Sequence, residues 1–381
     1  MTACRACGSK GVERVLDLGS VPAADHFPVA TEPISAEEST HRLAMDLCTS
    51  CGLAQLAEDD TVTDEPRGVE PQALRDQATR AVDEVAAAGW LRGSTVREFG
   101  SPHGGTWLPV LADRGFIEAS VADVVLDCFG IMHRPDQRRA FAERAAATAA
   151  DGVLLLQYHS LDTIVRRGQW NALRHGHFAY YSMPALRSLL ASAGMSVATA
   201  WHYDLYGGTV LVAAVHGVVE PDDAVHRIVA ADTPMTDPEV VRGLQRAADA
   251  HVEALREWLV AEAAVGRRVF AYGAASRAVA LMCLAGLDNS LVHAVADASP
   301  AKRGRRMPGT DIPIVSPTEM VDAQPDRVLL TVPDLLPEVQ QAYPQLEGRW
   351  VVDTVDVGAG VRPGELSGEP THGNTNRRGT V

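Results

Sequence analysis

The spacing of apolar residues predicts a region in the middle of the chain where strands and helices alternate. Short apolar runs bounded by turn residues are typical of buried strands, and apolar positions three or four residues apart are typical of helices. Their alternation predicts an α/β domain, a parallel sheet with crossover helices. The expected strands are 95–99, 121–126, 153–158 and 210–215, and the expected helices are 73–90, 106–114, 136–149 and 184–194.

A second alternation of strands and helices follows and predicts a smaller α/β domain nearer the C-terminus. It begins after one long predicted helix, which is apolar at positions such as Val240, Leu244 and Leu255. The spacing of these positions places them on one helical face. The expected helices are 237–265 and 278–284, and the expected strands are 269–272, 292–296, 327–332 and 350–352.

Two segments lack apolar periodicity and set the boundaries between the expected domains. Residues 58–71 are acidic, contain two prolines and are expected to form a linker or loop. From residue 358 the chain consists largely of polar residues, glycine and proline, so this tail is expected to be disordered. The predicted organisation is a cysteine-bearing module at 1–57, domains at 72–235 and 237–357, and a tail at 358–381.

Four of the six cysteines form two Cys-x-x-Cys pairs, Cys4 with Cys7 and Cys48 with Cys51, and a glycine directly follows each pair. Two thiolates from each turn can converge on one tetrahedral metal ion, and the glycine frees the backbone to complete the turn. Redox chemistry is the alternative for a single pair. Two matched pairs predict a structural zinc site, in which four protein ligands leave no position open for catalysis.

Composition and charge argue against two classes of binding partner, nucleic acids and membrane surfaces. Hydrophobic residues make up 46% and charged residues 22% of the 381 residues, and 34 Lys and Arg against 49 Asp and Glu give a net charge of −15. An acidic protein is a poor nonspecific binder of nucleic acid or of membrane surfaces. We find no apolar run near the roughly 18 residues of a membrane span and no signal peptide, so a cytoplasmic location is expected.

Two glycine-containing loops each join a predicted strand to a predicted helix. The first runs from Glu98 to Thr106. Such a loop lets a ligand approach the backbone and directs helix N–H groups at an anion or carboxylate, although an ordinary turn is the alternative. The second loop runs from Tyr272 to Ala278, and in it Arg277 is placed to pair with a phosphate. Asp297 ends the next strand and is either a ribose acceptor or a solvated acid.

The segment 174–182 concentrates titratable side chains, including His175 and His177. Imidazole titrates near neutral pH, so one of these histidines can take a proton from a carbon next to a ketone. A tyrosine can hold the resulting enolate oxygen. Tyr158 and His159 end the preceding strand, where ligands gather in open α/β sheets. A polar histidine pair without a catalytic role is the alternative.

Several motifs together resemble one family. They are the two Cys-x-x-Cys-Gly turns, Phe99-Gly100-Ser101 through Thr106, Arg174-His175-Gly176-His177 through Ser182, Tyr206-Gly207-Gly208-Thr209, and Met307 through Pro313. In this combination the chain resembles, over most of its length, the nucleotide-sugar C-methyltransferases of antibiotic deoxysugar pathways. The resemblance implies a zinc module followed by two Rossmann-like domains, the first being the methyltransferase domain.

The resemblance also implies an activity. Members of the family bind zinc structurally and methylate a carbon beside the keto group of a TDP-4-keto-deoxysugar. A histidine removes the proton, the methyl group comes from S-adenosylmethionine, and His177 falls on the position of the base. The catalytic candidates are His177, His175, Tyr181 and Tyr158. The cofactor candidates are Glu98, Gly100, Ser101, Gly104 and Gly105. The substrate candidates are Arg174, His159, Tyr206, Gly207, Gly208 and Arg277.

The chain departs from this family at several positions, and the largest departure is where the cofactor would bind. Gly176 stands in place of a glutamate, and the acidic run 58–60 stands in place of an aromatic segment. Between the expected helix 106–114 and strand 121–126, about 40 residues are missing that would form two strands and two helices. The missing part includes the acid that holds the cofactor ribose, although residues 116–118 offer a short substitute. The methyltransferase domain is therefore expected to be shortened.

These departures leave three alternatives open. The chain is a working C-methyltransferase with a trimmed cofactor site, or it keeps the sugar site and the His177 base for epimerisation beside a ketone without S-adenosylmethionine. The third alternative is a non-catalytic auxiliary protein. In each case we expect a nucleotide sugar as the ligand, no nucleic acid, no membrane, and a monomer or homodimer.

Overall fold

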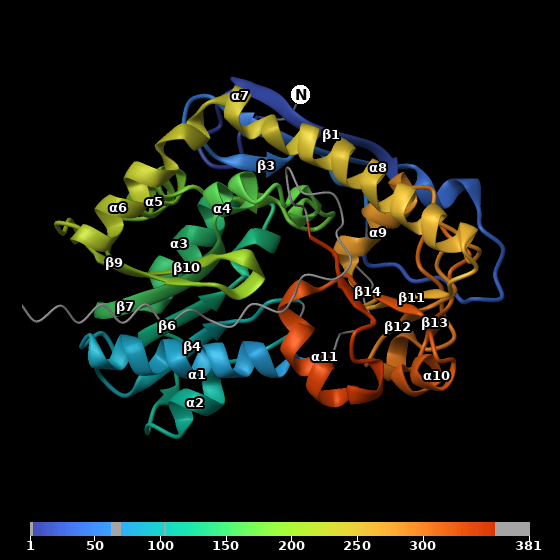
Figure 1. The fold of residues 1–381 in the computed structure, drawn as a ribbon. Coiled ribbons are helices and arrows are strands. Elements are labelled where there is room, and N and C mark those ends of the chain that lie inside the picture. Colours follow the sequence, from blue (N-terminus) through green and yellow to red (C-terminus); the bar gives the residue numbers. More distant parts are fainter. Residues whose placement is uncertain (1–2, 62–69, 103, 355–381) are drawn as a thin grey trace, which may run out of the picture.

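Three β-sheets organise the protein, and helices connect and cover them (Figure 1). The computed structural model describes residues 3–61, 70–102 and 104–354. Both α/β sheets that the sequence pattern predicts are present, each with its helices. The predicted tail 358–381 and most of the predicted linker lie outside the described residues. The boundaries drawn between the domains stay a prediction.

The N-terminal sheet is antiparallel and takes its last strand from a distant part of the chain. Strands β1 (Val12–Val21), β2 (His41–Cys48) and β3 (Ala54–Leu56) follow one another, and β8 (Ala179–Tyr180) pairs with β3. Because β8 begins two residues after His177, the N-terminal sheet holds the end of the histidine segment in place. The sequence pattern indicated neither this sheet nor its long-range pairing.

The central sheet has the strand order β5-β4-β6-β7-β10-β9. Four neighbouring strands are parallel, and β10 runs antiparallel between β7 and β9. The parallel strands bring their carboxyl ends to one edge, where the functional loops follow. The strand bounds are β4 (Thr95–Phe99), β5 (Ile117–Glu118), β6 (Ala122–Cys128), β7 (Thr148–His159), β9 (Met195–Tyr203) and β10 (Thr209–His216).

The shortened edge of this sheet is visible at β5. Ile117 pairs with Thr95 and Glu118 with Val96, so β5 accompanies only the first two residues of β4. Residues 116–118 thus supply the short strand that the sequence offered. It stops three residues before the carboxyl end of β4 at Phe99, about 10 Å at the rise of a strand. Beyond β5 this sheet has no further strand among the described residues.

Helices pack on both faces of the central sheet. On one face α1 buries Ala78, Val82 and Val85 in a cluster that includes Val96 of β4 and Leu111 of α2. The predicted helix 106–114 is shorter in the structure. The helices of this part are α1 (Gln72–Ala87), α2 (Leu108–Ala112), α3 (Gln137–Ala147), α4 (Leu161–Arg166), α5 (Met183–Ser192) and α6 (Asp223–Asp232).

The C-terminal sheet is fully parallel, with the order β13-β12-β11-β14-β15. Four of its strands lie within the predicted segments. The fifth, β13, was not predicted and lies between β12 and β14 in the sequence. The strands are β11 (Val269–Tyr272), β12 (Val295–Ala296), β13 (Ile314–Val315), β14 (Arg327–Leu330) and β15 (Trp350–Val352). The helices that accompany this sheet are α9 (Ser276–Leu284), α10 (Pro317–Asp322) and α11 (Leu336–Ala342).

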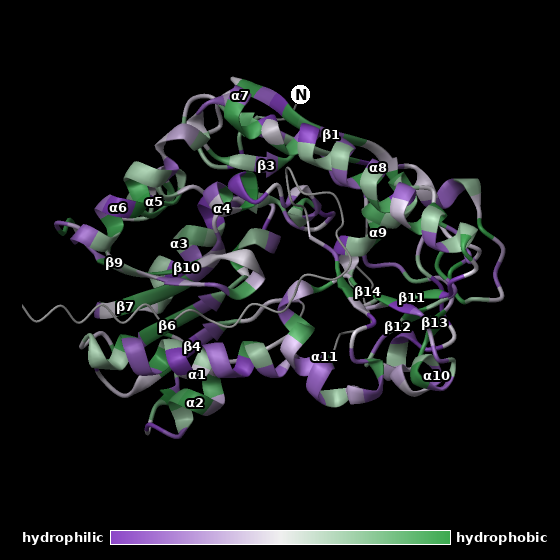
Figure 2. Ribbon diagram, viewed as in Figure 1, coloured by the Kyte–Doolittle hydropathy of each residue, from purple (hydrophilic) through white to green (hydrophobic). Residues whose placement is uncertain are grey.

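The predicted long helix 237–265 is two helices, α7 (Pro238–Val241) and α8 (Gly243–Ala264). The Asp237 side chain caps α7, which closes after one turn on Arg242. Gly243, a weak helix former, then starts α8. Helix α8 buries one face, which includes Leu244 and Leu255, and exposes hydrophilic residues on the other (Figure 2).

Helix α8 spans the molecule from the N-terminal sheet to the C-terminal sheet (Figure 1). It contacts β1, the short turn 170–172 and β11. Among the described residues, no helix has the length and apolar character needed to cross a membrane.

Candidate functional site

The two cysteine pairs come together in the N-terminal module. The four Sγ atoms lie within 4.8 Å of one another, and the Cys4–Cys51 and Cys7–Cys48 Sγ distances are both 3.6 Å. Four thiolates at about 2.3 Å from a zinc ion lie about 3.8 Å apart in a tetrahedron. The cluster therefore fits a zinc ion bound by four cysteines, and its closed ligand set suits a structural role.

The backbone forms the same turn at both cysteine pairs. The Gly8 amide donates to the Cys4 carbonyl and the Gly52 amide to the Cys48 carbonyl, each over 2.9 Å. Both glycines have a positive φ, 74° and 73°, which L-residues rarely adopt. This local symmetry directs both pairs of thiols at one point.

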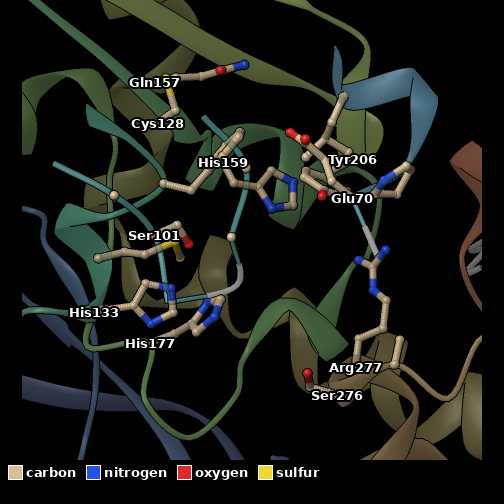
Figure 3. A pocket seen from close by; sticks show the side chains of 18 of the residues that line it. Glu70, Ser101, Cys128, His133, Gln157, His159, His177, Tyr206, Ser276 and Arg277 are labelled. Atoms are coloured by element: carbon tan, nitrogen blue, oxygen red, sulfur yellow. The ribbon is translucent and has the colours of Figure 1, made fainter. Parts of the chain in front are cut away.

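One cavity lies at the carboxyl edge of the central sheet and reaches the C-terminal sheet (Figure 3). It brings together two groups of predicted residues that are far apart in the sequence. From the cofactor group it is lined by Glu98, Gly100, Ser101, Gly104 and Gly105. From the catalytic and substrate groups it is lined by His159, Arg174, His177, Tyr206 and Arg277.

The glycine loop after β4 is held by the carboxylate of Glu98. Glu98 accepts hydrogen bonds from the Trp107 amide (2.7 Å) and from the Thr106 hydroxyl (2.5 Å), which closes the loop onto the start of α2. Burial raises the pKa of Glu98. At Gly100 and Gly104 a side chain would point into open space. The exposed backbone of this loop fits close approach by the methionine half of S-adenosylmethionine.

Among the described residues, no acid on the sheet edge takes the place of the usual partner of the cofactor ribose. Glu118, the acid on β5, is exposed and does not line the cavity. Its register opposite Val96 places it well below the carboxyl edge. Along the lining, the other carboxylate besides Glu98 belongs to Glu70, which precedes α1. Glu70 Oε1 lies 2.8 Å from the position that a Gly105 side chain would take.

His177 is buried, with 3% of its surface exposed, and its ring lies edge-on to His133 with a centroid distance of 4.4 Å. His133 Nδ1 is 3.0 Å from the Gly176 carbonyl, which can only accept, so Nδ1 carries the proton. The sequence analysis did not single out His133 as a site residue. The sequence could have indicated His133, because it follows β6 and therefore lies at the same sheet edge as the glycine loop.

Gly176 allows the turn that presents His177. Its φ is +76°, and its amide donates to the Asp59 carboxylate over 2.7 Å. Asp60 pairs with His41 over 2.8 Å. The acidic segment that was expected to be only a linker or loop is thus attached, at residues 59–60, to the histidine segment and to β2.

Three of the four catalytic candidates lie outside the cavity lining. His175 is buried, and its Nε2 donates to the Arg42 carbonyl over 3.2 Å. Tyr181 is 1% exposed and donates its hydroxyl to Gln137 Oε1. Tyr158 is 2% exposed, with its hydroxyl enclosed in the core. Of the four candidates only His177 lines the cavity, and a catalytic role of the three buried side chains stays a prediction that their position disfavours.

Two tyrosines that line the cavity differ in what their hydroxyls do. The Tyr180 hydroxyl donates to the Ala172 carbonyl and accepts from the Arg174 amide, so it is occupied by the backbone. Tyr206 adopts a positive φ of 53°, and its ring lies edge-on to Phe129. Of the two, Tyr206 is the one available to a ligand.

The turn after Tyr206 is shaped by Gly207 and Gly208, whose φ values are +80° and +137°. Neither lines the main cavity, and their assignment as substrate contacts stays a prediction. Gly207 lines a neighbouring cavity instead, and a side chain at Gly208 would meet Thr163 at 2.8 Å. Both glycines are needed for the close approach of the chain at this turn.

Basic side chains line the side of the cavity that faces the C-terminal sheet. Arg277, the second residue of α9, lines both this cavity and a neighbouring one. Arg166 and Arg167 line the neighbouring cavity as well. Burial and the nearby Arg174 lower the pKa of Arg277. An anionic ligand would relieve this repulsion, so the arrangement suits a phosphate.

Asp297 is occupied by the protein itself. Its carboxylate accepts from the amides of Ala274 and Ser299, both at 2.8 Å, and lies 3.7 Å from Lys302 Nζ. Of the two alternatives for this residue, the structure favours the strand-end acid over the ribose acceptor. It holds the turn between β11 and α9 in place.

Fold and site define an α/β enzyme of the methyltransferase type that carries a zinc module. Residues 4–63 match the family model "Putative zinc binding domain", and residues 204–354 match "C-methyltransferase C-terminal domain". The chain is thus similar to C-methyltransferases in its C-terminal part and to a zinc-binding domain in its N-terminal module. It is 26% identical to C-methyltransferase NovU of Streptomyces niveus, over 92% of this chain and 94% of that protein.

Solved methyltransferase structures resemble the chain only distantly. The 1,6-didemethyltoxoflavin-N1-methyltransferase of Burkholderia thailandensis matches 44% of this chain and 96% of its own, with 13% identity and a TM-score of 0.30. The magnesium protoporphyrin IX methyltransferase of Synechocystis matches 38% of this chain and 84% of its own, with 14% identity and a TM-score of 0.28. At these TM-scores neither structure bears on the function.

Proposed function

We propose that the protein transfers a methyl group from S-adenosylmethionine to a carbon beside the keto group of a TDP-linked deoxysugar, with His177 as the base. The observation that carries the proposal is the single cavity shared by the glycine loop and His177. NovU, the relative that aligns with most of the chain, is named as a C-methyltransferase. S-adenosylmethionine supplies the methyl group when bound.

The charges around the cavity suit these two ligands. Glu70 and Glu98 lie on the side of the glycine loop, where the positive charge of the cofactor would be favoured. Arg174, Arg277 and Lys302 line other parts of the same cavity. The diphosphate of the sugar nucleotide would pair with Arg277, and its nucleoside would extend into the neighbouring cavity beside Arg167.

His177 is the proton acceptor in this proposal. A proton on a carbon beside a ketone is acidic enough for a positioned imidazole to remove, because the enolate spreads the charge onto oxygen. His133, edge-on to His177, is fixed by its bond to the Gly176 carbonyl and positions the His177 ring. The hydroxyl of Tyr206 would donate to the enolate oxygen.

The test is calorimetric titration with S-adenosylmethionine, followed by a methyl-transfer assay on TDP-4-keto-deoxysugars. We expect micromolar cofactor binding and transfer to carbon. His177→Gln should lower kcat by about 10²–10⁴-fold, the usual contribution of a general base, without changing cofactor affinity. Near-normal kcat in this variant would remove His177 as the base, and absence of cofactor binding to the wild type would refute methyl transfer.

The short strand β5 favours a second candidate function, epimerisation beside the ketone without the cofactor. If S-adenosylmethionine does not bind, the same cavity and His177 still suit proton exchange. The experiment is incubation of the keto-sugar in D2O without cofactor, read by NMR. Deuterium beside the ketone with altered configuration at that carbon would establish this function. Exchange with retained configuration, leading to transfer once cofactor is added, supports methylation.

A further inference from the structure

His159 lies at the end of β7 and lines the cavity with one edge of its ring (Figure 3). Its Nε2 is 3.0 Å from Gln169 Oε1. Gln169 in turn donates its amide nitrogen to the Tyr206 carbonyl over 3.3 Å. The Gln169 side chain also packs so closely against Gly207 that a Cβ there would lie 2.1 Å from Gln169 Nε2.

These contacts fix which nitrogen of His159 carries the proton. The Tyr206 carbonyl only accepts, so Gln169 must turn its NH2 group toward it and its oxygen toward His159. An oxygen at that position requires a proton on His159 Nε2. Nδ1 of the neutral ring is then an acceptor. It has no protein partner among the residues that the structure describes, and it is not one of the enclosed polar atoms.

His159 also stays neutral across the physiological range. Burial lowers the pKa of His159 to about 3, and the charges of Arg277 and Arg174 act in the same direction. A ring with such a pKa is a weak base, and it is unsuited to remove a proton from carbon. It is well suited to accept a hydrogen bond from a neutral donor at any pH at which the protein is folded.

The neighbourhood of Arg277 indicates which donor this is. In a nucleotide sugar the diphosphate is attached to the anomeric carbon, and the hydroxyl on the next ring carbon is the sugar hydroxyl nearest to it. We propose that His159 Nδ1 accepts a hydrogen bond from the 2-hydroxyl of the sugar, so that the enzyme selects keto-sugars that retain this group over 2-deoxy sugars. This inference rests on the proposed placement of the diphosphate at Arg277.

The preference follows from the cost of an unmet acceptor. A site built to bind a hydroxyl rejects the analogue that lacks it, because the buried acceptor then loses its partner. We expect at least about 10-fold weaker binding of the 2-deoxy sugar. Since His159 does not titrate near neutrality, this ratio should stay constant between about pH 6 and 9.

The experiment compares a TDP-4-keto-6-deoxyhexose with its 2-deoxy counterpart by calorimetry, on the zinc-loaded full chain. His159→Phe keeps an aromatic ring and removes the acceptor, and His159→Leu removes the acceptor together with the ring. Both variants should bind the 2-hydroxy sugar about 10-fold more weakly and lose most of the discrimination between the two sugars. Circular dichroism and zinc content report whether each variant is folded.

The outcomes separate this inference from the proposed function. If the wild type discriminates and folded His159→Phe discriminates equally well, His159 does not bind the hydroxyl. A wild type without preference between the two sugars overturns the inference as well, while methyl transfer to either sugar leaves the proposed function intact. If His159→Phe does not fold, His159→Leu decides, because it also removes the acceptor and places a smaller side chain at the same position. Failure of both sugars to bind the wild type refutes the proposed function itself.

Discussion

At the scale of single residues, side chains that are neighbours in one sequence motif lie in different environments, some at the cavity and others in the core. Of the aromatic and imidazole groups between Arg174 and Ser182, only His177 and Tyr180 line the cavity. His175 and Tyr181 are buried in the protein instead. The alternation of sides along this short segment follows from the turn at Gly176 and from the pairing of β8. Neither is visible in residue types alone.

Removing the hydroxyl group is expected to change the free energy of unfolding differently at the two buried tyrosines, Tyr181 and Tyr158. The Tyr181 hydroxyl donates to Gln137, whereas the Tyr158 hydroxyl has no partner among the residues described in the structure. Tyr181→Phe should lower the free energy of unfolding by about 1–2 kcal/mol, because Gln137 is left unpaired. Tyr158→Phe should leave it unchanged or raise it.

Urea denaturation measures both tyrosine variants, and each serves as the control for the other because both delete one hydroxyl. Neither should alter kcat by more than about twofold, since neither side chain reaches the cavity. A large loss of kcat in Tyr181→Phe with unchanged stability would restore Tyr181 to the catalytic group.

At the scale of elements, the sequence pattern predicted the strands whose formation depends on neighbouring residues in the chain. Strands β4, β11 and β15 have the predicted bounds because each is short and lies between turn residues, and β11 and β15 are apolar throughout. Strand β8 was missed, since a two-residue strand exists only through its pairing with β3, more than a hundred residues earlier in the chain. The shared cavity could be anticipated from strand ends, but the contact of His159 with Gln169 depends on side-chain packing.

The pairing of β3 with β8 couples the zinc site to the histidine segment. Removing zinc with a chelator should unfold the cysteine turns, free β3 and release β8, because folding of such modules depends on the metal. We expect turnover and amide protection of residues 179–180 to fall together. Hydrogen exchange read by mass spectrometry measures the second quantity.

Re-addition of zinc should restore both properties. Cys283→Ser is the matched control, since Cys283 lies outside the cysteine cluster and its Sγ contacts Ser39. This variant should keep its zinc and respond to the chelator as the wild type does. Unchanged melting and unchanged exchange after complete metal removal would contradict a structural role for the zinc site.

At the scale of the whole molecule, a buried arginine fastens the N-terminal module to the C-terminal sheet. Arg306 is 2% exposed, pairs with Glu38, and donates to the carbonyls of Glu32, Pro33 and Thr310. The hydrogen bond from Arg306 lowers the pKa of Glu38 to about 2 from its usual 4.5. The two parts are thus joined by a charge pair whose arginine is buried and whose carboxylate is partly exposed.

This pair predicts the sign of one pH effect. Because the pKa of Glu38 is lower in the folded state, its contribution to stability is complete above about pH 4.5 and is lost as the pH falls toward 2. Glu38→Gln should be less stable than the wild type at pH 6, and the difference should shrink as the solution is acidified.

Urea denaturation of both proteins between pH 6 and 3 measures this difference. Protonation of the cysteines and release of zinc affect the two proteins equally, so the comparison isolates the carboxyl group. A difference that stays constant with pH would show that Glu38 contributes through shape and not through its charge.

Strand β8 also determines when the N-terminal sheet can be completed during synthesis of the protein. While the chain leaves the ribosome, β1, β2 and β3 emerge within the first 56 residues, but the edge of β3 stays unpaired until residues 179–180 have followed. An open edge strand is a template for pairing with other chains. The nascent N-terminal module is therefore most exposed to wrong partners during the synthesis of the central domain, and its last strand arrives together with the histidine segment.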